Sequence, residues 1–167
     1  MTDAMTEYPG FFSTENFKLN VSGPVIETWQ SHRQITRHLH ESFGVLVGSK
    51  SSDASIYWLD EITTPLPDDT HTRFSFILMD KGHQEKVNHA YRKSANRLGY
   101  MGTWHTHPEN YPVPSTIDLH DWRACSARNQ DRKMFFIIVG IKQTKLFTFQ
   151  NQQITSTTLI IGNDSDE

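Results

Sequence analysis

The sequence contains almost no cysteine: Cys125 is the only one among 167 residues. A single thiol can form neither an internal disulfide nor a zinc site made of several cysteines. The N-terminus also lacks a basic segment followed by a continuous apolar run, so nothing in it indicates a secretory signal. These absences lead us to expect a cytoplasmic protein.

Long apolar runs and an excess of positive charge are missing as well. The longest apolar stretch, Phe135 to Val139 with Met134 before it, is far too short to cross a bilayer. The formal net charge is −3, which gives no compositional support for binding to nucleic acid or anionic lipid and leaves room only for a local basic patch. We therefore expect neither nucleic acid nor a membrane as a partner.

The length of the chain is typical of one domain with a single core. Hydrophobic residues make up 36% of the sequence and charged residues 21%, a balance that is too apolar for general disorder. We expect an N-terminal arm over residues 1–16, one domain over residues 17–161 and an acidic tail over residues 162–167.

Hydrophobic periodicity predicts three helices within this domain, over residues 23–40, 80–98 and 115–129. Strands are predicted at residues 17–21, 43–48, 56–62, 73–79, 100–107, 134–141, 145–150 and 154–161. Residues 63–70 are rich in turn formers and are expected to form a mobile loop. This order predicts an α/β fold in which a mixed β-sheet is flanked by helices.

Nine histidines are the unusual part of the composition, and their spacing singles out one pair. His105 and His107 are two positions apart in a predicted strand, which places both imidazoles on the same face. Asp118 falls in the first turn of the next predicted helix, where its carboxylate can point back at the strand end. Two histidines, one aspartate and a water are the composition of a catalytic zinc site, because structural zinc sites have four protein ligands.

A His-x-His pair alone is weak evidence in this chain, and His38 and His40 form a second one. Only the pair at 105 and 107 is followed by serine and aspartate eight and eleven positions later, at Ser115 and Asp118, a combination that chance produces on the order of a few times per thousand. Ser-x-x-Asp also suits a helix cap, and the cap and the site can coexist. Cys125 is interpreted as an inert buried thiol rather than a ligand.

The motif His105-x-His107, seven residues, Ser115, two residues, Asp118 resembles in full the signature of the JAMM metalloproteases, also called MPN-plus or JAB domains. Upstream, Glu41-Ser-Phe-Gly-Val-Leu-Val-Gly is similar to the family's pattern of a glutamate before a strand, although Phe43 stands where a glycine is frequent. The resemblance implies a single MPN/JAB-type domain.

The same resemblance implies the roles of five residues. His105, His107 and Asp118 would hold zinc, which lowers the pKa of a bound water toward about 7. Glu41 would be the general base that takes a proton from this water and passes it to the leaving amine. Ser115 would donate a hydrogen bond to the oxyanion that develops on the scissile carbonyl. The resemblance therefore predicts a zinc metalloprotease.

The residues around the motif look closest to a bacterial group encoded in anti-phage operons (CBASS) beside ubiquitin-like activating and conjugating proteins. This resemblance implies an isopeptidase that frees the C-terminus of a ubiquitin-like protein or a cGAS-like nucleotidyltransferase from its targets. The expected partner is a protein with a flexible C-terminal tail, bound as an extended strand between residues 63–70 and 108–114. Two alternatives stay open: a JAMM peptidase that processes a precursor or sulfur-carrier tail, and a non-catalytic MPN scaffold.

Overall fold

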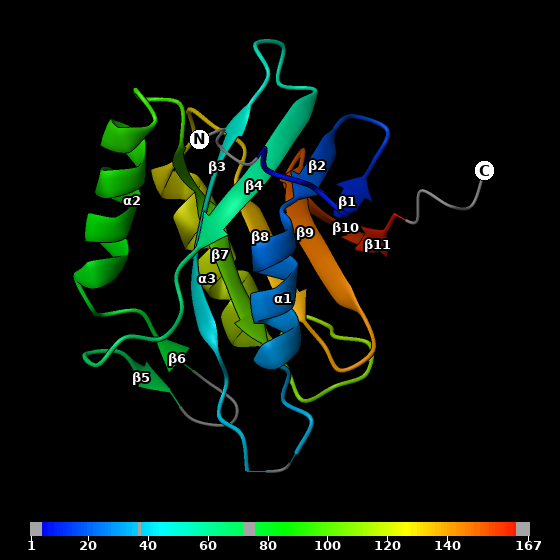
Figure 1. Ribbon diagram of the computed structural model, residues 1–167. Coiled ribbons are helices and arrows are strands. Elements are labelled where there is room, and N and C mark those ends of the chain that lie inside the picture. Colours follow the sequence, from blue (N-terminus) through cyan, green and yellow to red (C-terminus); the bar gives the residue numbers. More distant parts are fainter. Residues whose placement is uncertain (1–4, 37, 72–75, 163–167) are drawn as a thin grey trace.

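The computed structural model describes residues 5–36, 38–71 and 76–162. Three helices and a large mixed sheet form within these residues, as the sequence predicts (Figure 1). The helices are α1 (Gly23–Ser31), α2 (Gly82–Lys93) and α3 (Thr116–Arg128). The strands are β1 (Gly10–Ser13), β2 (Lys18–Val21), β3 (Phe43–Lys50), β4 (Ile56–Ile62), β5 (Thr70–His71), β6 (Phe76–Ile77), β7 (Gly99–Thr106), β8 (Phe135–Val139), β9 (Thr144–Gln150), β10 (Gln153–Thr158) and β11 (Ile160–Ile161).

The main sheet has the strand order β10-β9-β8-β7-β3-β4-β2-β1-β11, and β5 and β6 form a separate two-stranded sheet. Strand β7 lies in the middle, antiparallel to β3 and parallel to β8. All five residues of β8 are buried, as expected for a parallel strand that is covered on both faces. The centre of the sheet is therefore the best-protected part of the molecule.

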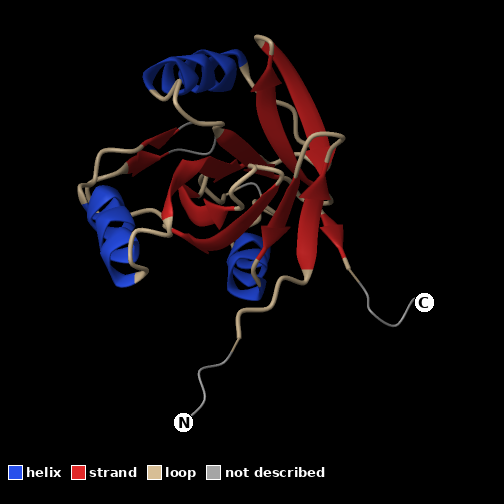
Figure 2. Cartoon of the chain, turned by 90° about the horizontal axis from the view of Figure 1, so that it is seen from above, coloured by secondary structure: helices blue, strands red, loops and turns tan. Residues whose placement is uncertain are grey.

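The sheet curves until its two ends approach each other (Figure 2). Strands β10 and β11 stand at opposite ends of the strand order, yet only Leu159 separates them in sequence. Strand β11 pairs with β1, and the Thr157 hydroxyl on β10 donates a hydrogen bond to the Ser13 carbonyl on β1. The C-terminal strands thus connect both ends of the sheet.

Helix α1 covers one face of the sheet, and helices α2 and α3 cover the other (Figure 1). Strand β8 shows this division directly, because Phe135 and Ile137 pack in the α1 cluster while Phe136 and Ile138 pack in the α3 cluster. No helix in the described part of the chain is long and apolar enough to span a membrane.

The first helix is shorter than the sequence predicts, because α1 ends at Ser31 rather than near residue 40. The apolar residues that extend the pattern, Ile35 and Leu39, are largely exposed and do not reach the core. Gln34, directly before Ile35, is buried, and its side-chain amide donates a hydrogen bond to the Leu39 carbonyl. A buried side chain that bonds to the backbone in this way stabilises a loop instead of a helix.

The N-terminal residues differ from the expected arm, because Gly10–Ser13 form strand β1 between β2 and β11. Phe12 is fully buried there. Four residues are too few for a clear alternating pattern, and the Pro9-Gly10 pair indicates a turn.

Three other expected elements also have different bounds. Helix α2 ends at Lys93 instead of residue 98, because Ala95 and Asn96 have positive φ angles that no helix continues through. The strand predicted at 154–161 is divided where the Leu159 amide donates to the Thr144 carbonyl. Of the strand predicted at 73–79, residues 73–75 lie outside the described residues, and 76–77 form β6.

Candidate metal centre

His105 and His107 lie at the C-terminal end of β7, on the face covered by α3. His105 is buried, with its ring near that of Trp122 on α3. His107 follows the last strand residue, and its amide donates to the Val139 carbonyl of β8. The two Nε2 atoms are 3.1 Å apart. The expectation that both rings share one face of this strand is confirmed.

Asp118 approaches the two histidines from the first turn of α3. Its Oδ1 lies 3.2 Å from His105 Nε2, and its Oδ2 lies 3.2 Å from His107 Nε2. The turn is fixed by a capping box, in which Ser115 Oγ accepts a hydrogen bond from the Asp118 amide and Asp118 Oδ2 accepts one from the Ser115 amide. The hydroxyl proton of Ser115 is not used by this cap.

These distances can be compared with those of a metal site. Ligands bound to zinc at 2.0–2.1 Å in tetrahedral geometry are about 3.3 Å apart, close to the separations between His105, His107 and Asp118. Donor atoms of Glu41, His105 and His107 also lie within 4.8 Å of one another. Nitrogen lone pairs and carboxylates that converge in this way fit a divalent metal ion.

Glu41 precedes β3 and is connected to the histidine strand by its neighbour. The Ser42 amide donates to Thr106 Oγ1, and the Thr106 amide donates to the Ser42 carbonyl. Glu41 Oε1 lies 3.6 Å from His107 Nε2, while Oε2 is buried without a hydrogen-bond partner among the described residues. A free oxygen is therefore available beside His105, His107 and Asp118, the group of candidate metal ligands that is called the metal cluster below.

The glycine at the fourth position of the Glu41 pattern has a steric reason. A Cβ atom on Gly44 would lie 1.8 Å from the Thr63 carbonyl oxygen, where the chain leaves β4 and crosses next to β3. The Thr63 amide donates to the Val45 carbonyl across this contact, and the Val45 amide donates to Thr63 Oγ1. Only glycine allows the two backbones to come this close.

The charges of the cluster follow from its burial. Burial raises the pKa of Glu41 to about 8, although His107 opposes the rise. Burial also raises the pKa of Asp118, but its hydrogen bonds with both histidines outweigh this and hold the pKa well below its usual range. For His105 burial is decisive and lowers the pKa. Burial also lowers the pKa of His107, but Asp118, Glu109 and Glu41 together outweigh it and raise the pKa.

Glu109 orients His107, a role that the sequence does not reveal. The His107 Nδ1–H group donates to Glu109 Oε1 at 2.8 Å, which leaves Nε2 as the lone pair facing the cluster. Glu109 stands two positions after the histidine, but a single acidic residue in a proline-rich loop has no distinguishing pattern. Metal-binding histidines commonly donate their second ring N–H to a carboxylate, so an acidic residue close to His107 in sequence is the only signal that could have identified Glu109.

Residues 63–82 lie beside the cluster. They are called the hairpin segment below, because their described residues include the paired strands β5 and β6. Asp69 is the buried centre of this segment. Asp69 Oδ1 accepts hydrogen bonds from the amides of Met79 and Asp80, and Oδ2 accepts from the Leu66 amide and from His83 Nε2 at 2.5 Å. Burial raises the pKa of Asp69, but these donors together lower it to about 2.

The hairpin segment is connected to Glu41 by two routes. His83 carries its proton on Nε2 toward Asp69, so its Nδ1 accepts from the Thr63 hydroxyl at 2.6 Å, and Thr63 in turn contacts β3. His71 Nδ1 donates to the Glu41 carbonyl at 2.7 Å. The sequence identifies none of these residues, because the partners are 14 to 30 positions apart.

A cavity of about 370 Å³ lies between the hairpin segment and α3 and reaches the metal cluster at Asp118. Its lining combines apolar residues such as Phe76, Leu78 and Trp122 with the charged residues Asp121 and Arg128. Cys125 also lines it, in a hydrophobic cluster with Trp122, and its sulfur lies 3.4 Å from the Tyr100 hydroxyl. This thiol is buried, as expected.

Comparison with known proteins gives consistent results. The model of the family described as prokaryotic homologs of the JAB domain matches residues 29–153. A protein of Vibrio cholerae serotype O1 named CD-NTase/cGAS isopeptidase is 35% identical over 137 residues, which cover 81% of this chain and 84% of that protein. A protein of the same name from Escherichia coli is 32% identical over 122 residues, which cover 73% of this chain and 76% of that protein.

A solved structure shows the same fold. The solution structure of a protein from Desulfitobacterium hafniense superimposes with a TM-score of 0.55 at 19% identity, over 81% of this chain and 87% of that one. The arrangement of strands and helices therefore recurs in a protein of distant sequence.

Proposed function

The chain belongs to the family of prokaryotic homologs of the JAB domain, and from this membership we propose that it is a zinc-dependent isopeptidase that releases a conjugated protein from its targets. Relatives that are 31–35% identical carry the name CD-NTase/cGAS isopeptidase. The observation that carries the proposal is the convergence of His105, His107 and Asp118 at 3.1 to 3.2 Å beside the buried, unpartnered oxygen of Glu41.

His105, His107 and Asp118 would hold the zinc ion. When bound, zinc supplies a Lewis acid that polarises a carbonyl and makes water more acidic. The chain prepares this site in two ways: Glu109 fixes the tautomer of His107, and the capping box fixes the Asp118 carboxylate. Three ligands leave one position open for water or substrate, which is the composition of catalytic zinc sites.

Glu41 would act as the general base of the hydrolysis. A water adds to the scissile carbonyl carbon, the C–N bond breaks, and the proton that Glu41 accepts from the water passes to the leaving lysine amine. Burial raises the Glu41 pKa to about 8 in the metal-free site, and a nearby cation lowers a carboxyl pKa toward the range of a base that works near neutral pH. Ser115 would donate its free hydroxyl proton to the developing oxyanion.

The substrate would be a protein joined through its C-terminus to a lysine of another protein. We propose a cGAS-like nucleotidyltransferase or a ubiquitin-like protein as the donor, in anti-phage defence, because the relatives are named for the first of these. The tail of the donor would enter as an extended strand beside the metal cluster, bordered by residues 63–70 and 108–114, and the adjoining cavity between β6 and α3 would place Phe76 and Trp122 against its side chains.

The test uses the purified protein and two sets of fusions, one with varied donor tails and one with varied acceptor peptides around the same bond. We expect about one zinc per chain by metal analysis, cleavage that a strong chelator abolishes and zinc restores, and sensitivity mainly to the last residues of the donor. Sensitivity to the acceptor alone would instead contradict the tail model.

The same experiment separates the alternatives. Cleavage of a precursor or sulfur-carrier tail at a peptide bond, without cleavage of a lysine isopeptide, would indicate a processing peptidase. A protein that binds no zinc and cleaves neither substrate would be a scaffold. The five residues of the motif, Glu41, His105, His107, Ser115 and Asp118, disfavour the scaffold because a binding role requires none of their chemistry.

A further inference from the structure

A second concave site lies at the opposite end of the two strands that carry the metal cluster. Glu41 precedes β3 and His105 is near the end of β7, whereas this cavity is lined by the end of β3 and the start of β7. Gly99 is six residues before His105, which at about 3.3 Å per residue puts roughly 20 Å between the two places. The cavity has a volume of about 260 Å³ and is distinct from the one beside α3.

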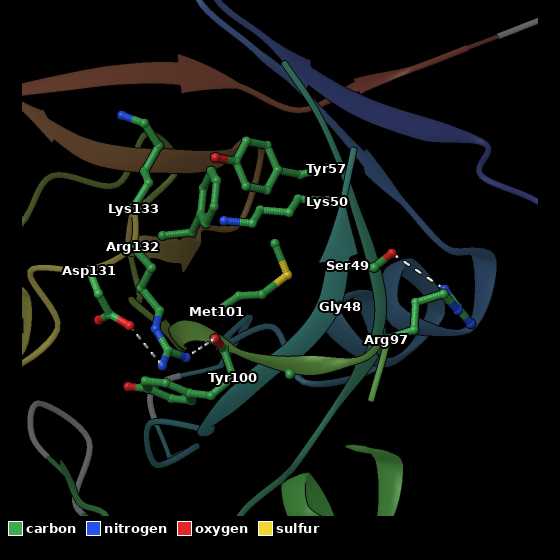
Figure 3. A pocket seen from close by; sticks show the side chains of 12 residues that line it. Gly48, Ser49, Lys50, Tyr57, Arg97, Tyr100, Met101, Asp131, Arg132 and Lys133 are labelled. Carbon is green, nitrogen blue, oxygen red and sulfur yellow. Dashed lines mark hydrogen bonds and ion pairs between the residues drawn. The ribbon is translucent and has the colours of Figure 1, made fainter. Parts of the chain in front are cut away.

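The side chains around this cavity are strongly cationic in a protein whose formal net charge is −3. Four cations line it, against the single carboxylate of Asp131. These cations are Lys50, Arg97, Arg132 and Lys133 (Figure 3). They come from three separate parts of the chain, so the concentration of charge is a product of the fold and no run of basic residues predicts it.

Lys50 and Tyr57 form the wall of the cavity that carries the least compensated groups. They are directly opposite each other in the β3–β4 pair and therefore project from the same face of the sheet. Both side chains extend in the same direction, toward the side where Lys133 and Arg132 stand (Figure 3). Among the described residues, neither the Lys50 ammonium nor the Tyr57 hydroxyl has a hydrogen-bond or ion-pair partner.

The other cations are only weakly neutralised. Arg132 contacts the Tyr100 carbonyl at 3.4 Å and the exposed Asp131 carboxylate at 3.6 Å, distances at which a surface pair contributes little. The Lys133 ammonium lies over the ring of Phe17 instead of near an acid, and burial lowers its pKa. Arg97 is the exception, because Asp60 lies 3.7 Å from it.

The base of the cavity is formed by buried apolar side chains. Met101 and Phe135 contribute to it and are at most 7% exposed, so their surfaces offer little area for stacking a planar group. Recognition at this site must therefore come from charge and hydrogen bonds at the rim. Ammonium, guanidinium and phenol groups are all donors, so the ligand must consist largely of acceptor oxygens.

We propose that this cavity is a binding site for a small anion of the phosphate class, held by Lys50, Arg132 and the Tyr57 hydroxyl. A guanidinium fork and a compact ammonium on facing walls are the combination that grips tetrahedral oxyanions. The volume of about 260 Å³ suits a phosphate or diphosphate group better than an acidic peptide, which needs an extended groove. This site is independent of the proposed hydrolysis, because it shares no residue with the metal cluster.

The test is calorimetric titration of the full chain with inorganic pyrophosphate and, separately, with ADP, at low and moderate salt. We expect saturable binding with one site per chain that weakens as salt rises. Replacing both Lys50→Gln and Arg132→Gln should lower the affinity at least tenfold, and Tyr57→Phe should lower it by roughly two- to tenfold. The double variant Lys81→Gln and Lys86→Gln removes the same charge from exposed positions on and before α2 and should bind within twofold of the parent.

The two probes identify the source of the phosphate class. Equal affinities indicate that the phosphate groups alone are recognised, and tighter binding of ADP indicates a nucleotide. Unchanged thermal unfolding of the variants shows that the exposed side chains were removed without loss of the fold. Absence of saturable binding by the parent overturns the proposal, as does binding that survives the Lys50 and Arg132 substitutions, since that signal would come from the metal cluster. Tighter binding of a hexaglutamate peptide than of pyrophosphate overturns it in favour of a protein partner.

Discussion

Two regions border the metal cluster, and different forces hold them in place. Strand β7, which brings His105 to the site, lies in the middle of the main sheet and has buried side chains on both faces. The hairpin segment, residues 63–82, contributes only the two-residue strands β5 and β6 outside that sheet. It is attached by a polar network around Asp69 and His83 and by the stacking of Phe76 on Phe43.

This difference separates two kinds of stability. The histidines are fixed by the same core that holds the domain together, so they move only when the domain unfolds. The hairpin segment depends on a few hydrogen bonds and on the contacts of Phe76 and Leu78, so it can open at a lower free energy than the central sheet. Metal ligands must keep a fixed geometry, whereas a segment beside the site must be able to move if an extended peptide is to enter.

The change Glu41→Gln tests the comparison at the point where the two regions meet, and we expect the largest effect from it. The amide keeps the size of the side chain but cannot accept a proton, so turnover of an isopeptide substrate should fall by about 10²–10⁴-fold. Zinc content and thermal unfolding should match the parent. Activity within a few-fold of the parent would remove Glu41 from the mechanism.

Gly102→Ala should break the central region. Gly102 has a φ of 141°, and a Cβ atom there would lie 1.8 Å from the Phe135 carbonyl oxygen of β8. We expect a loss of about 2–4 kcal/mol in the free energy of unfolding, from strain and overpacking together. Denaturant titration measures it, and amide exchange should rise throughout β3, β7 and β8. A change confined to the hairpin segment would contradict the comparison.

Asp69→Asn should loosen the hairpin segment alone. Four donors lose their ionised acceptor, and loss of these charge-assisted bonds should lower the free energy of opening the hairpin segment by about 2–3 kcal/mol. Hydrogen exchange should accelerate at amides such as those of Met79 and Asp80, with β7 unchanged. Asp68→Asn is the matched control, because this exposed neighbour makes no side-chain bond to the network. Equal exchange in both variants would show that Asp69 is not the anchor.

Lowering the pH from about 4 to about 2 should produce the smallest effect, and it should again loosen the hairpin segment alone. The pKa of Asp69 is lowered to about 2 in the folded protein, so its stabilisation is complete above its unfolded value near 4 and is lost as the pH falls through about 2. The full loss is about 2 kcal/mol. Exchange in the hairpin segment should rise over this window in the parent but not in Asp69→Asn. An identical acid response in the two proteins would assign it to other carboxylates.

The sequence is informative where chemistry and local geometry coincide. The spacing of His105 and His107 on a strand, and the serine-to-aspartate spacing of a helix cap, are both local patterns, and they place three groups at one point. The polar network of the hairpin segment and the orientation of His107 by Glu109 depend on contacts that no period encodes. Strand β1 escapes prediction because it is four residues long and one of its two neighbouring strands, β11, lies about 150 positions later.

The pairing of β1 with β11 also constrains how the protein is made. Strand β1 has both of its neighbouring strands only after residues 160–161, the last described strand, have left the ribosome. During synthesis the first strand therefore waits, with one edge open, until nearly the whole domain has emerged. Contacts between such distant parts of a chain form slowly, and unpaired edges promote aggregation meanwhile. We expect nascent chains stopped before residue 153 to need chaperones, and folding to complete late and in a single step.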